Sequence, residues 1–283
     1  MKSLLYVPGD SERKIAKARE SGADAIILDL EDAIAPDSKE NARQIVTQIL
    51  RDSDFGKKRI FVRINSIRTR LALDDARAVA STGKAGILIP KAEHADEVTT
   101  IAPILASYTS TPANANRILC LIESPTGVLE ARSIAAASPL VAGLIFGSAD
   151  LVRETGCILT EGEPELHYAR SHVLLAARSA GVCAYDSPHF VIADIDGLLR
   201  SSQMVRNLGY DGRTIIHPDH VDTVNRVFTP QPDEIEQARR IVQALEQAAA
   251  EGRGAIALDG RLIDQVHLAN ARKLLAQVEE ISH

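Results

Sequence analysis

The chain has 283 residues, of which 45% are hydrophobic and 25% charged, the composition of an ordinary globular protein that can bury a sizeable core. Its net charge of −6 offers no general attraction to nucleic acid or anionic membranes, and no apolar stretch approaches the ~20 residues of a membrane-spanning helix. Three widely spaced cysteines argue against a disulfide framework or structural zinc site, and the short apolar N-terminal segment is no secretory signal, so a cytoplasmic protein is expected.

Short runs rich in Val, Ile and Leu alternate with charged or alanine-rich segments along the chain. In order, these runs cover residues 4–7, 25–30, 60–64, 86–89, 118–122, 143–146, 182–185 and 214–216. The segments between them, for example 11–21, 38–51, 73–82 and 167–180, are long enough for crossover helices. This alternation predicts an α/β protein with parallel strands, and eight repeats favour a (β/α)₈ TIM barrel over an open doubly wound sheet.

The pattern changes after Pro218. A proline-rich linker around 230–232 precedes a long alanine-rich helix over 234–250, the pair Asp259-Gly260 predicts a tight turn, and a final helix runs to the C-terminus. We therefore expect a catalytic barrel over residues 1–229 and a helical and hairpin extension over 230–283. Such an extension acts either as a lid or as an element that reaches a neighbouring subunit.

Polar side chains close several of the predicted strands, and strand parity points the acids Asp29, Glu31 and Glu123 and the bases Arg63 and Lys91 into the barrel mouth. The strand-end acids Asp150 and Asp186 are expected to join them there. An acidic excess in a confined site needs protonation or a cation, although any single acid can equally cap a helix or pair with a base. Because Mg²⁺ commonly takes one or two protein carboxylates, Glu123 and Asp150, on consecutive strands, are the predicted ligands.

The other candidate residues at the mouth have a functional and a structural interpretation each. Arg63 is placed to receive a substrate carboxylate, or to pair with Glu31. The backbone N–H groups of Gly147, Ser148 and Ala149 can bind a small carboxylate beside the metal, or form a plain turn. Lys91 can act as a Schiff-base lysine, but acidic neighbours favour a supporting electrostatic role, together with Asp29 and Glu31. His189 and His217 are possible general bases, with loop packing the favoured role.

Seven segments in chain order carry a family resemblance: Leu5-Tyr6-Val7-Pro8-Gly9, Ile27-Leu28-Asp29-Leu30-Glu31-Asp32, Val62-Arg63-Ile64-Asn65, Ile89-Pro90-Lys91, Ile122-Glu123-Ser124-Pro125, Phe146-Gly147-Ser148-Ala149-Asp150-Leu151 and Ile216-His217-Pro218. With them the chain resembles the citrate lyase beta subunit and malyl-CoA lyase family of the HpcH/HpaI aldolase superfamily. The resemblance implies a TIM barrel with Mg²⁺ on Glu123 and Asp150 and substrate contacted by Arg63. It also implies a homotrimer or homohexamer in which each tail reaches the next subunit's active site.

In that family a tail motif Gly-x-Met-Ile-Asp supplies an acid–base carboxylate. Gly260-Arg261-Leu262-Ile263-Asp264 matches it with Leu for Met, so the resemblance implies a catalytic Asp264. The alternative is that Asp264 stabilises the hairpin.

The implied activity is Mg²⁺-dependent cleavage of a carbon–carbon bond in a citryl-, citramalyl- or malyl-type 3-hydroxyacyl thioester, giving an acyl thioester and a 2-oxo acid. The thioester carrier is coenzyme A or an acyl carrier protein, and Arg13, Lys14 and Lys17 are possible contacts for coenzyme A phosphates. The segment 185–189 departs from citrate lyase beta subunits, which leaves the acyl group open. Alternatives are a metal-dependent aldolase acting on free 4-hydroxy-2-oxo acids and a non-catalytic or regulatory member of the fold.

Overall fold

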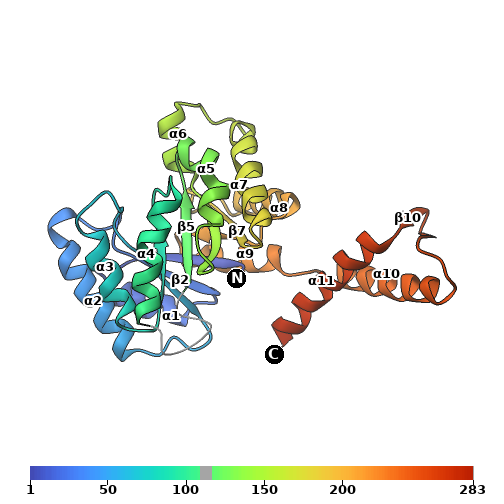
Figure 1. Cartoon of the computed structure of the whole chain (residues 1–283), viewed down its shortest axis with the longest axis horizontal. Helices are drawn as coiled ribbons and strands as arrows, with labels where there is room; N and C mark the ends of the chain where they lie inside the picture. Colours follow the sequence, from blue (N-terminus) through green and yellow to red (C-terminus); the bar gives the residue numbers. More distant parts are fainter. Residues whose placement is uncertain (109–116, 283) are drawn as a thin grey trace. The chain divides into compact units, whose positions relative to one another are not determined.

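The computed structural model describes residues 1–108 and 117–282 and confirms the predicted TIM barrel (Figure 1). Within these residues eight parallel strands pair in sequence order, and β8 pairs with β1 to close the barrel. The barrel strands are β1 Ser3–Pro8, β2 Ala25–Asp29, β3 Arg59–Arg63, β4 Gly86–Ile89, β5 Ile118–Ile122, β6 Val141–Phe146, β7 Cys183–Asp186 and β8 Gly212–Ile215.

Helices follow the strands and surround the barrel (Figure 1). They are α1 Glu12–Glu20, α2 Lys39–Asp52, α3 Ala72–Ala80, α4 Ala95–Ser107, α5 Pro125–Ala135, α6 Ser148–Thr155, α7 His167–Ser179, α8 Ile195–Leu208 and α9 Val221–Phe228, with short 3₁₀ turns η1 Pro36–Ser38, η2 Pro164–Leu166 and η3 Pro218–His220. Each of the longer helices buries one stripe against the strands: in α2, Ala42, Val46 and Leu50 recur every four residues and are buried. Among the described helices, none is long and apolar enough to cross a membrane.

Alternate strand residues face the lumen and the helices, as the pleat of a strand requires. The lumen core consists of Leu4, Ala25, Ile27, Phe61, Leu88, Leu119, Leu121, Ile145 and Tyr185. Strand residues of the other parity, such as Ile26, Leu28 and Val62, belong to the larger core between strands and helices. One layer above the lumen core, the same parity brings Asp29, Arg63 and Glu123 to the C-terminal mouth.

Helix caps that follow β5 and β6 determine the positions of Glu123 and Asp150. Ser124 ends the short connection after β5 and caps α5, because its hydroxyl accepts a hydrogen bond from the Gly127 amide at 3.0 Å, and Pro125 occupies the first helical position. Gly147 is the N-cap of α6. Glu123 and Asp150 therefore lie at the starts of two consecutive helices.

The C-terminal residues form a second compact unit, Thr229–His283, while the barrel unit is Met1–Phe228. Helix α10 Pro232–Ala250 and helix α11 Gln265–Ser282 flank the hairpin of β9 Ile256–Leu258 and β10 Arg261–Ile263. The turn residues Asp259 and Gly260 have φ of 50° and 75°, the left-handed values of a type I′ turn, as the Asp-Gly pair predicts. Contact with a neighbouring subunit stays a prediction.

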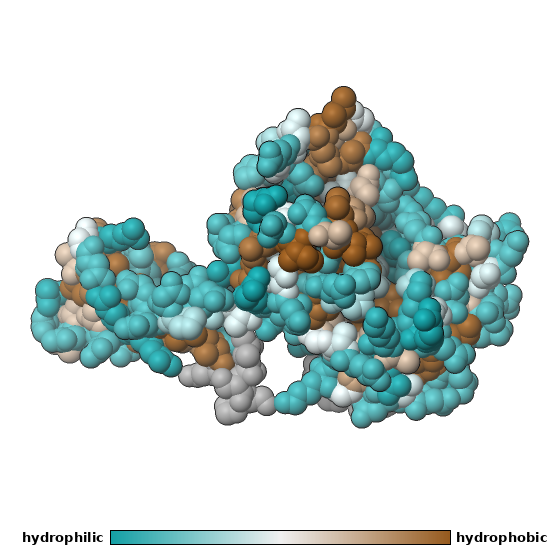
Figure 2. Space-filling view, turned by 180° about the vertical axis from the view of Figure 1, so that it is seen from behind, coloured by the Kyte–Doolittle hydropathy of each residue, from teal (hydrophilic) through white to brown (hydrophobic). Residues whose placement is uncertain are grey.

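The surface is largely hydrophilic on the face seen in Figure 2, with separate hydrophobic areas. Within the barrel unit, large apolar side chains that are at least two-thirds exposed are Leu129, Ile158, Tyr168 and Leu175.

Candidate functional site

A cavity of about 420 Å³ opens at the C-terminal mouth of the barrel. Most of the predicted site residues line it: Asp29, Arg63, Glu123, Gly147, Ser148, Ala149 and Asp150. Further lining residues that were not predicted from the sequence are Tyr6, Ser187, Phe190, Thr214 and Ile216. Strand parity contained a signal for Tyr6 and Thr214, because they alternate with helix-facing residues. The loop residues Ser187 and Phe190 have no such signal.

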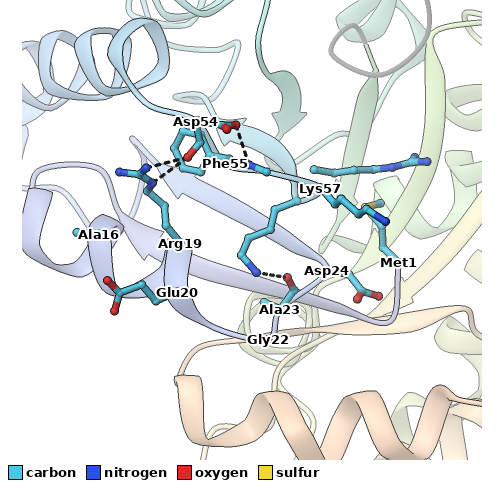
Figure 3. Close-up of a pocket in the computed structure, with 13 residues that line it drawn as sticks. Met1, Ala16, Arg19, Glu20, Gly22, Ala23, Asp24, Asp54, Phe55 and Lys57 are labelled. Carbon is cyan, nitrogen blue, oxygen red and sulfur yellow. Dashed lines mark hydrogen bonds between the residues drawn. The ribbon is translucent and has the colours of Figure 1, made fainter. Parts of the chain in front are cut away.

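A larger cavity of about 780 Å³ lies at the opposite end, where β2 and β3 begin (Figure 3). Two of its cations bind backbone oxygens: Arg19 donates two hydrogen bonds to the Asp54 carbonyl, and Lys58 donates to the Ala23 carbonyl at 3.1 Å. These contacts join the connection before β2 to the one before β3. Because this end of a TIM barrel serves stability, we assign the cavity a structural role.

Arg63 and Asp29 form a two-pronged ion pair at the mouth. The Arg63 Nε and Nη2 atoms lie 2.7 and 2.5 Å from the two Asp29 carboxylate oxygens, and the guanidinium lies 5.1 Å from the centre of the Tyr6 ring. Arg63 Nη1 is 3.2 Å from Glu31 Oε2. The main ion-pair partner is thus Asp29, and any substrate contact is limited to the N–H groups that Asp29 leaves available.

Lys91 connects two of the acids. Its Nζ is 2.6 Å from Glu31 Oε1, and its backbone N–H donates to Glu123 Oε1 at 2.9 Å from a left-handed conformation with φ of 50°. Burial alone lowers the pKa of Lys91, but the hydrogen bond and charge of Glu31 outweigh it and raise the pKa. The ammonium therefore stays charged, which favours an electrostatic role over Schiff-base chemistry.

Glu123 and Asp150 are two acids in one cavity. Glu123 is only 6% exposed, and burial, followed by the negative charges of Asp150 and Glu31, raises its pKa to about 8. Gly147 makes this packing possible, because a Cβ there would lie 2.6 Å from the Glu123 Cβ. Asp150 Oδ1 pairs with Arg153 at 2.6 Å. A buried carboxylate beside a second one is the situation that a bound divalent cation relieves.

The donor set fits Mg²⁺ better than a metal that needs a full protein cage. Among the side chains that the structure describes, in residues 1–108 and 117–278, no group of three or more His, Cys, Asp or Glu is arranged to hold a metal. Two carboxylates are nevertheless enough for Mg²⁺, which keeps several of its waters and takes oxygen atoms from the substrate.

The start of α6 offers backbone amides to an anion, but not all of those predicted. The Gly147 N–H donates to the Ile122 carbonyl at 2.8 Å and is not free, contrary to the prediction. The amides of Ser148 and Ala149 lie in the first helical turn, where N–H groups have no helical acceptor. Gly147 contributes close packing against Glu123 instead.

The prediction that Asp186 faces the mouth is wrong. Asp186 is fully buried and pairs with Arg170 Nε at 3.0 Å and Arg213 Nη2 at 3.2 Å. Its lumen-facing neighbour is Tyr185, so strand parity sends Asp186 toward the helices. Two arginines distant in the sequence neutralise it there.

Neither predicted histidine lines the mouth cavity. The His217 Nδ1 atom accepts a hydrogen bond from the Asp219 amide at 3.3 Å and caps η3, while His189 Nε2 lies 3.5 Å from Asp194. Both contacts agree with the favoured packing role. His217 does line an adjacent cavity of about 390 Å³, together with Arg13, Lys14 and Lys17.

Asp264 lies at the start of α11 in the C-terminal unit. Its Oδ1 accepts a hydrogen bond from the Val266 amide at 3.0 Å and is 2.8 Å from His267 Nδ1. The hydrogen bond from His267 is the main cause that lowers the pKa of Asp264. Through these contacts Asp264 stabilises the start of α11, which agrees with a structural role. Its acid–base role stays a prediction.

Comparison with known proteins places this site in a family. The model of the HpcH/HpaI aldolase/citrate lyase family matches residues 2–218. The (3S)-malyl-CoA thioesterase of Cereibacter sphaeroides (strain ATCC 17025) is 35% identical over 281 residues, which cover 99% of this chain and 95% of the relative.

Two solved structures from Mycobacterium tuberculosis are each 31% identical to the chain. Protein CitE in complex with magnesium, acetoacetate and coenzyme A has a TM-score of 0.81 over 97% of both chains. The citrate lyase beta subunit complexed with oxaloacetate and magnesium has a TM-score of 0.68 over 81% of this chain and 96% of the other. The chain belongs to the HpcH/HpaI aldolase/citrate lyase family.

Proposed function

We propose that the chain is a Mg²⁺-dependent carbon–carbon lyase that cleaves a 3-hydroxyacyl thioester into an acyl thioester and a 2-oxo acid. The observation that carries this proposal is the pair of buried Glu123 and half-buried Asp150 at the barrel mouth beside Arg63. The solved relatives, which hold magnesium with acetoacetate and coenzyme A or with oxaloacetate, support it. Cys120, Cys157 and Cys183 are free thiols, which supports a protein that acts in the reducing cytoplasm.

In this proposal Glu123 and Asp150 hold the ion. When bound, Mg²⁺ supplies Lewis-acid stabilisation to the substrate hydroxyl and the carboxylate beside it. The amides of Ser148 and Ala149 bind that carboxylate, and Arg63, held rigid by Asp29, provides a fixed positive charge where the enolate forms.

The chemical step needs one group that removes the proton of the substrate hydroxyl and later donates it to the thioester α-carbon. We assign it to Asp264, supplied by a neighbouring subunit of a homotrimer or homohexamer, whose carboxylate would accept the hydroxyl proton. The bond between the hydroxyl-bearing carbon and the thioester α-carbon then breaks, which leaves the 2-oxo acid, and its electron pair forms the thioester enolate. Asp264 returns the proton to that carbon, so no co-reactant is consumed.

The carrier of the thioester is assigned from the adjacent cavity. Arg13, Lys14 and Lys17 line it, and it shares Tyr6 through Pro8 with the mouth cavity. Three basic side chains suit the phosphates of coenzyme A better than the single phosphate of an acyl carrier protein's prosthetic arm. Calorimetric titration with acetyl-CoA tests this: binding supports coenzyme A, and no binding favours a carrier protein or an aldolase of free acids.

A second candidate is hydrolysis of the thioester itself, which the similarity to a (3S)-malyl-CoA thioesterase favours. Water would then cleave the carbon–sulfur bond and release a free thiol and a free acid. The two activities differ in their products, because a lyase releases a 2-oxo acid and leaves the thioester intact.

One assay separates these candidates. Malyl-, citramalyl- and citryl-CoA, and a free 4-hydroxy-2-oxo acid, are incubated with the Mg²⁺-loaded protein while 2-oxo acid and free thiol are measured in parallel. The proposal expects 2-oxo acid without thiol from at least one thioester. Thiol alone would identify a thioesterase, activity on the free acid alone an aldolase, and no product from any substrate would support a non-catalytic role.

A further inference from the structure

We propose that His220 is a positioning residue of the mouth cavity, because its imidazole N–H holds the connection between β7 and α8 in the conformation that lines the cavity. We name this connection, residues 187–194, the mouth loop. Its residues Ser187, Pro188 and Phe190 line the mouth cavity. The inference rests on the proposed function, since the mouth loop is one wall of the proposed substrate site.

The mouth loop has little structure of its own. It contains neither helix nor strand, and in the described structure its backbone makes a single internal hydrogen bond, from the Asp194 amide to the Val191 carbonyl at 3.1 Å. Burial of apolar side chains does not hold it either, since Phe190, Val191 and Ile192 are 54%, 59% and 45% exposed. The conformation of the loop therefore depends on contacts from residues outside it.

The start of the mouth loop is anchored by Arg213 on β8. The Arg213 Nε and Nη2 atoms donate to the Ser187 carbonyl at 3.0 and 2.8 Å, and Nη1 donates to the hydroxyls of Ser201 and Ser202 on α8. With the bond to Asp186, the guanidinium uses as many hydrogen bonds as it has N–H groups. Because Arg213 also joins β7 and α8, its substitution would disturb more than the mouth loop.

The far end of the mouth loop is anchored by His220. This residue is fully buried in the 3₁₀ turn after β8, and its Nε2 atom lies 2.9 Å from the Ile192 carbonyl oxygen. A carbonyl oxygen only accepts hydrogen bonds, so Nε2 carries the hydrogen. The Nδ1 atom is buried and has no hydrogen-bond partner among the described residues. In that part of the chain, the hydrogen bond of the His220 side chain thus goes to the mouth loop.

Packing alone does not account for a histidine here. A buried ring with an unpaired nitrogen is less favourable than an apolar ring of similar size in the same space. What the imidazole adds is a fixed position for the Ile192 carbonyl, two residues after Phe190. With Ser187 held at one end and Ile192 at the other, the residues between them have little freedom to leave the cavity wall.

The proposed metal ligands have contacts of their own. Glu123 accepts a hydrogen bond from the Lys91 amide, and Asp150 pairs with Arg153, so neither contact involves the mouth loop. Loss of the His220 anchor should therefore weaken binding of the thioester in the mouth and leave Mg²⁺ affinity unchanged. General damage to the fold would lower both affinities.

Two substitutions separate the hydrogen bond from the volume of the ring. His220→Phe keeps an aromatic ring and removes the N–H donor, whereas His220→Gln keeps a side-chain N–H at similar reach. Calorimetry on the full chain with saturating Mg²⁺ should give an acetyl-CoA affinity about tenfold lower in His220→Phe and within about threefold of the wild type in His220→Gln. Mg²⁺ affinity should be unchanged in both. His172→Phe on α7, which lines neither the mouth cavity nor the adjacent one, is the matched control.

A tryptophan in the mouth loop reports the anchor without any ligand. The chain has no tryptophan, so Val191→Trp places a single one at an exposed position that does not line the mouth cavity. Its fluorescence anisotropy should fall when His220→Phe is added and stay the same when His220→Gln is added.

Each contrary result has its own meaning. Unchanged acetyl-CoA affinity or unchanged anisotropy in His220→Phe would overturn the inference. Equal losses in His220→Gln, or a parallel loss of Mg²⁺ affinity, would also overturn it, because the ring or the whole fold would then be responsible. If His220→Phe does not fold, His220→Leu is measured by the same criteria. No binding of acetyl-CoA by the wild type would refute the proposed coenzyme A site, and the inference with it, even where the anisotropy still shows the anchor.

Discussion

Gly147 shows how one residue can decide the geometry of the candidate metal site. Any side chain at this position would press on Glu123, since the added Cβ would lie 2.6 Å from the Glu123 Cβ and 3.0 Å from its Oε2. The residue is not in a left-handed conformation, so space rather than backbone strain requires glycine here. Lys91 acts on the same acid from another side through its backbone N–H.

Gly147→Ala should therefore displace Glu123. Overpacking of this kind costs about 1–3 kcal/mol of stability, and Mg²⁺ affinity should fall at least tenfold because a ligand moves. Calorimetry and thermal unfolding measure the two effects. Gly254→Ala is the matched control, because a Cβ there meets nothing within 4 Å; equal Mg²⁺ affinity in both variants would contradict the packing argument.

At the scale of elements, each strand and the helix after it act as one positioning unit. Strand β5 ends at Ile122, Glu123 follows, and Ser124 caps α5, so three consecutive residues have separate tasks. After strand β6, Gly147 is the N-cap of α6 and Asp150 lies in the first turn of that helix. The orientation of both predicted ligands thus depends on how well these helix starts are fixed.

Loss of the α5 cap should affect the metal site as well as stability. Ser124→Ala removes the hydrogen bond from the Gly127 amide and should cost about 1 kcal/mol, with a several-fold loss of Mg²⁺ affinity because Glu123 is adjacent. Asp194→Ala removes the equivalent cap of α8, where Asp194 accepts from the Gly197 amide at 2.8 Å. Denaturant unfolding should show similar losses in both variants, and a similar Mg²⁺ affinity in both would refute the coupling.

The elements were more predictable from the sequence than the contacts between them. The periodicity of short apolar runs predicted all eight barrel strands to within two residues at each end, and parity correctly placed Asp29, Arg63 and Glu123 together. Asp186 was placed at the mouth from its position at a strand end, whereas its parity sends it toward the helices. Its partners, Arg170 and Arg213, are on other elements and could not be identified from the sequence. Arg63 and Asp29 also lie on different strands, so nothing in the sequence indicated that they would form an ion pair.

For the whole molecule, the open question is how its two units cooperate. The barrel unit contains the Glu123–Asp150 pair, whereas Asp264 belongs to the unit from Thr229 onward. If Asp264 acts in the barrel of a neighbouring copy, each active site is composite and the oligomer is the catalytic entity. A monomer would then bind Mg²⁺ but turn over slowly.

Subunit complementation tests this arrangement. Asp264→Asn should keep the α11 cap, because Asn caps as well as Asp, while turnover falls about 10²- to 10⁴-fold. Glu123→Gln should be inactive through its metal site. A co-assembled mixture of the two should regain a substantial part of wild-type turnover, because some sites combine intact residues from different chains. A mixture as inactive as its components would contradict a shared site, and Asp259→Asn serves as a control in the same unit.

If Glu123 and Asp150 form a Mg²⁺ site, calorimetric titration of Mg²⁺ into the wild type, Glu123→Gln and Asp150→Asn will show it. We expect one site per chain in the wild type and no measurable binding in either variant, with the barrel still folded by circular dichroism. Unchanged Mg²⁺ affinity in both variants would contradict it.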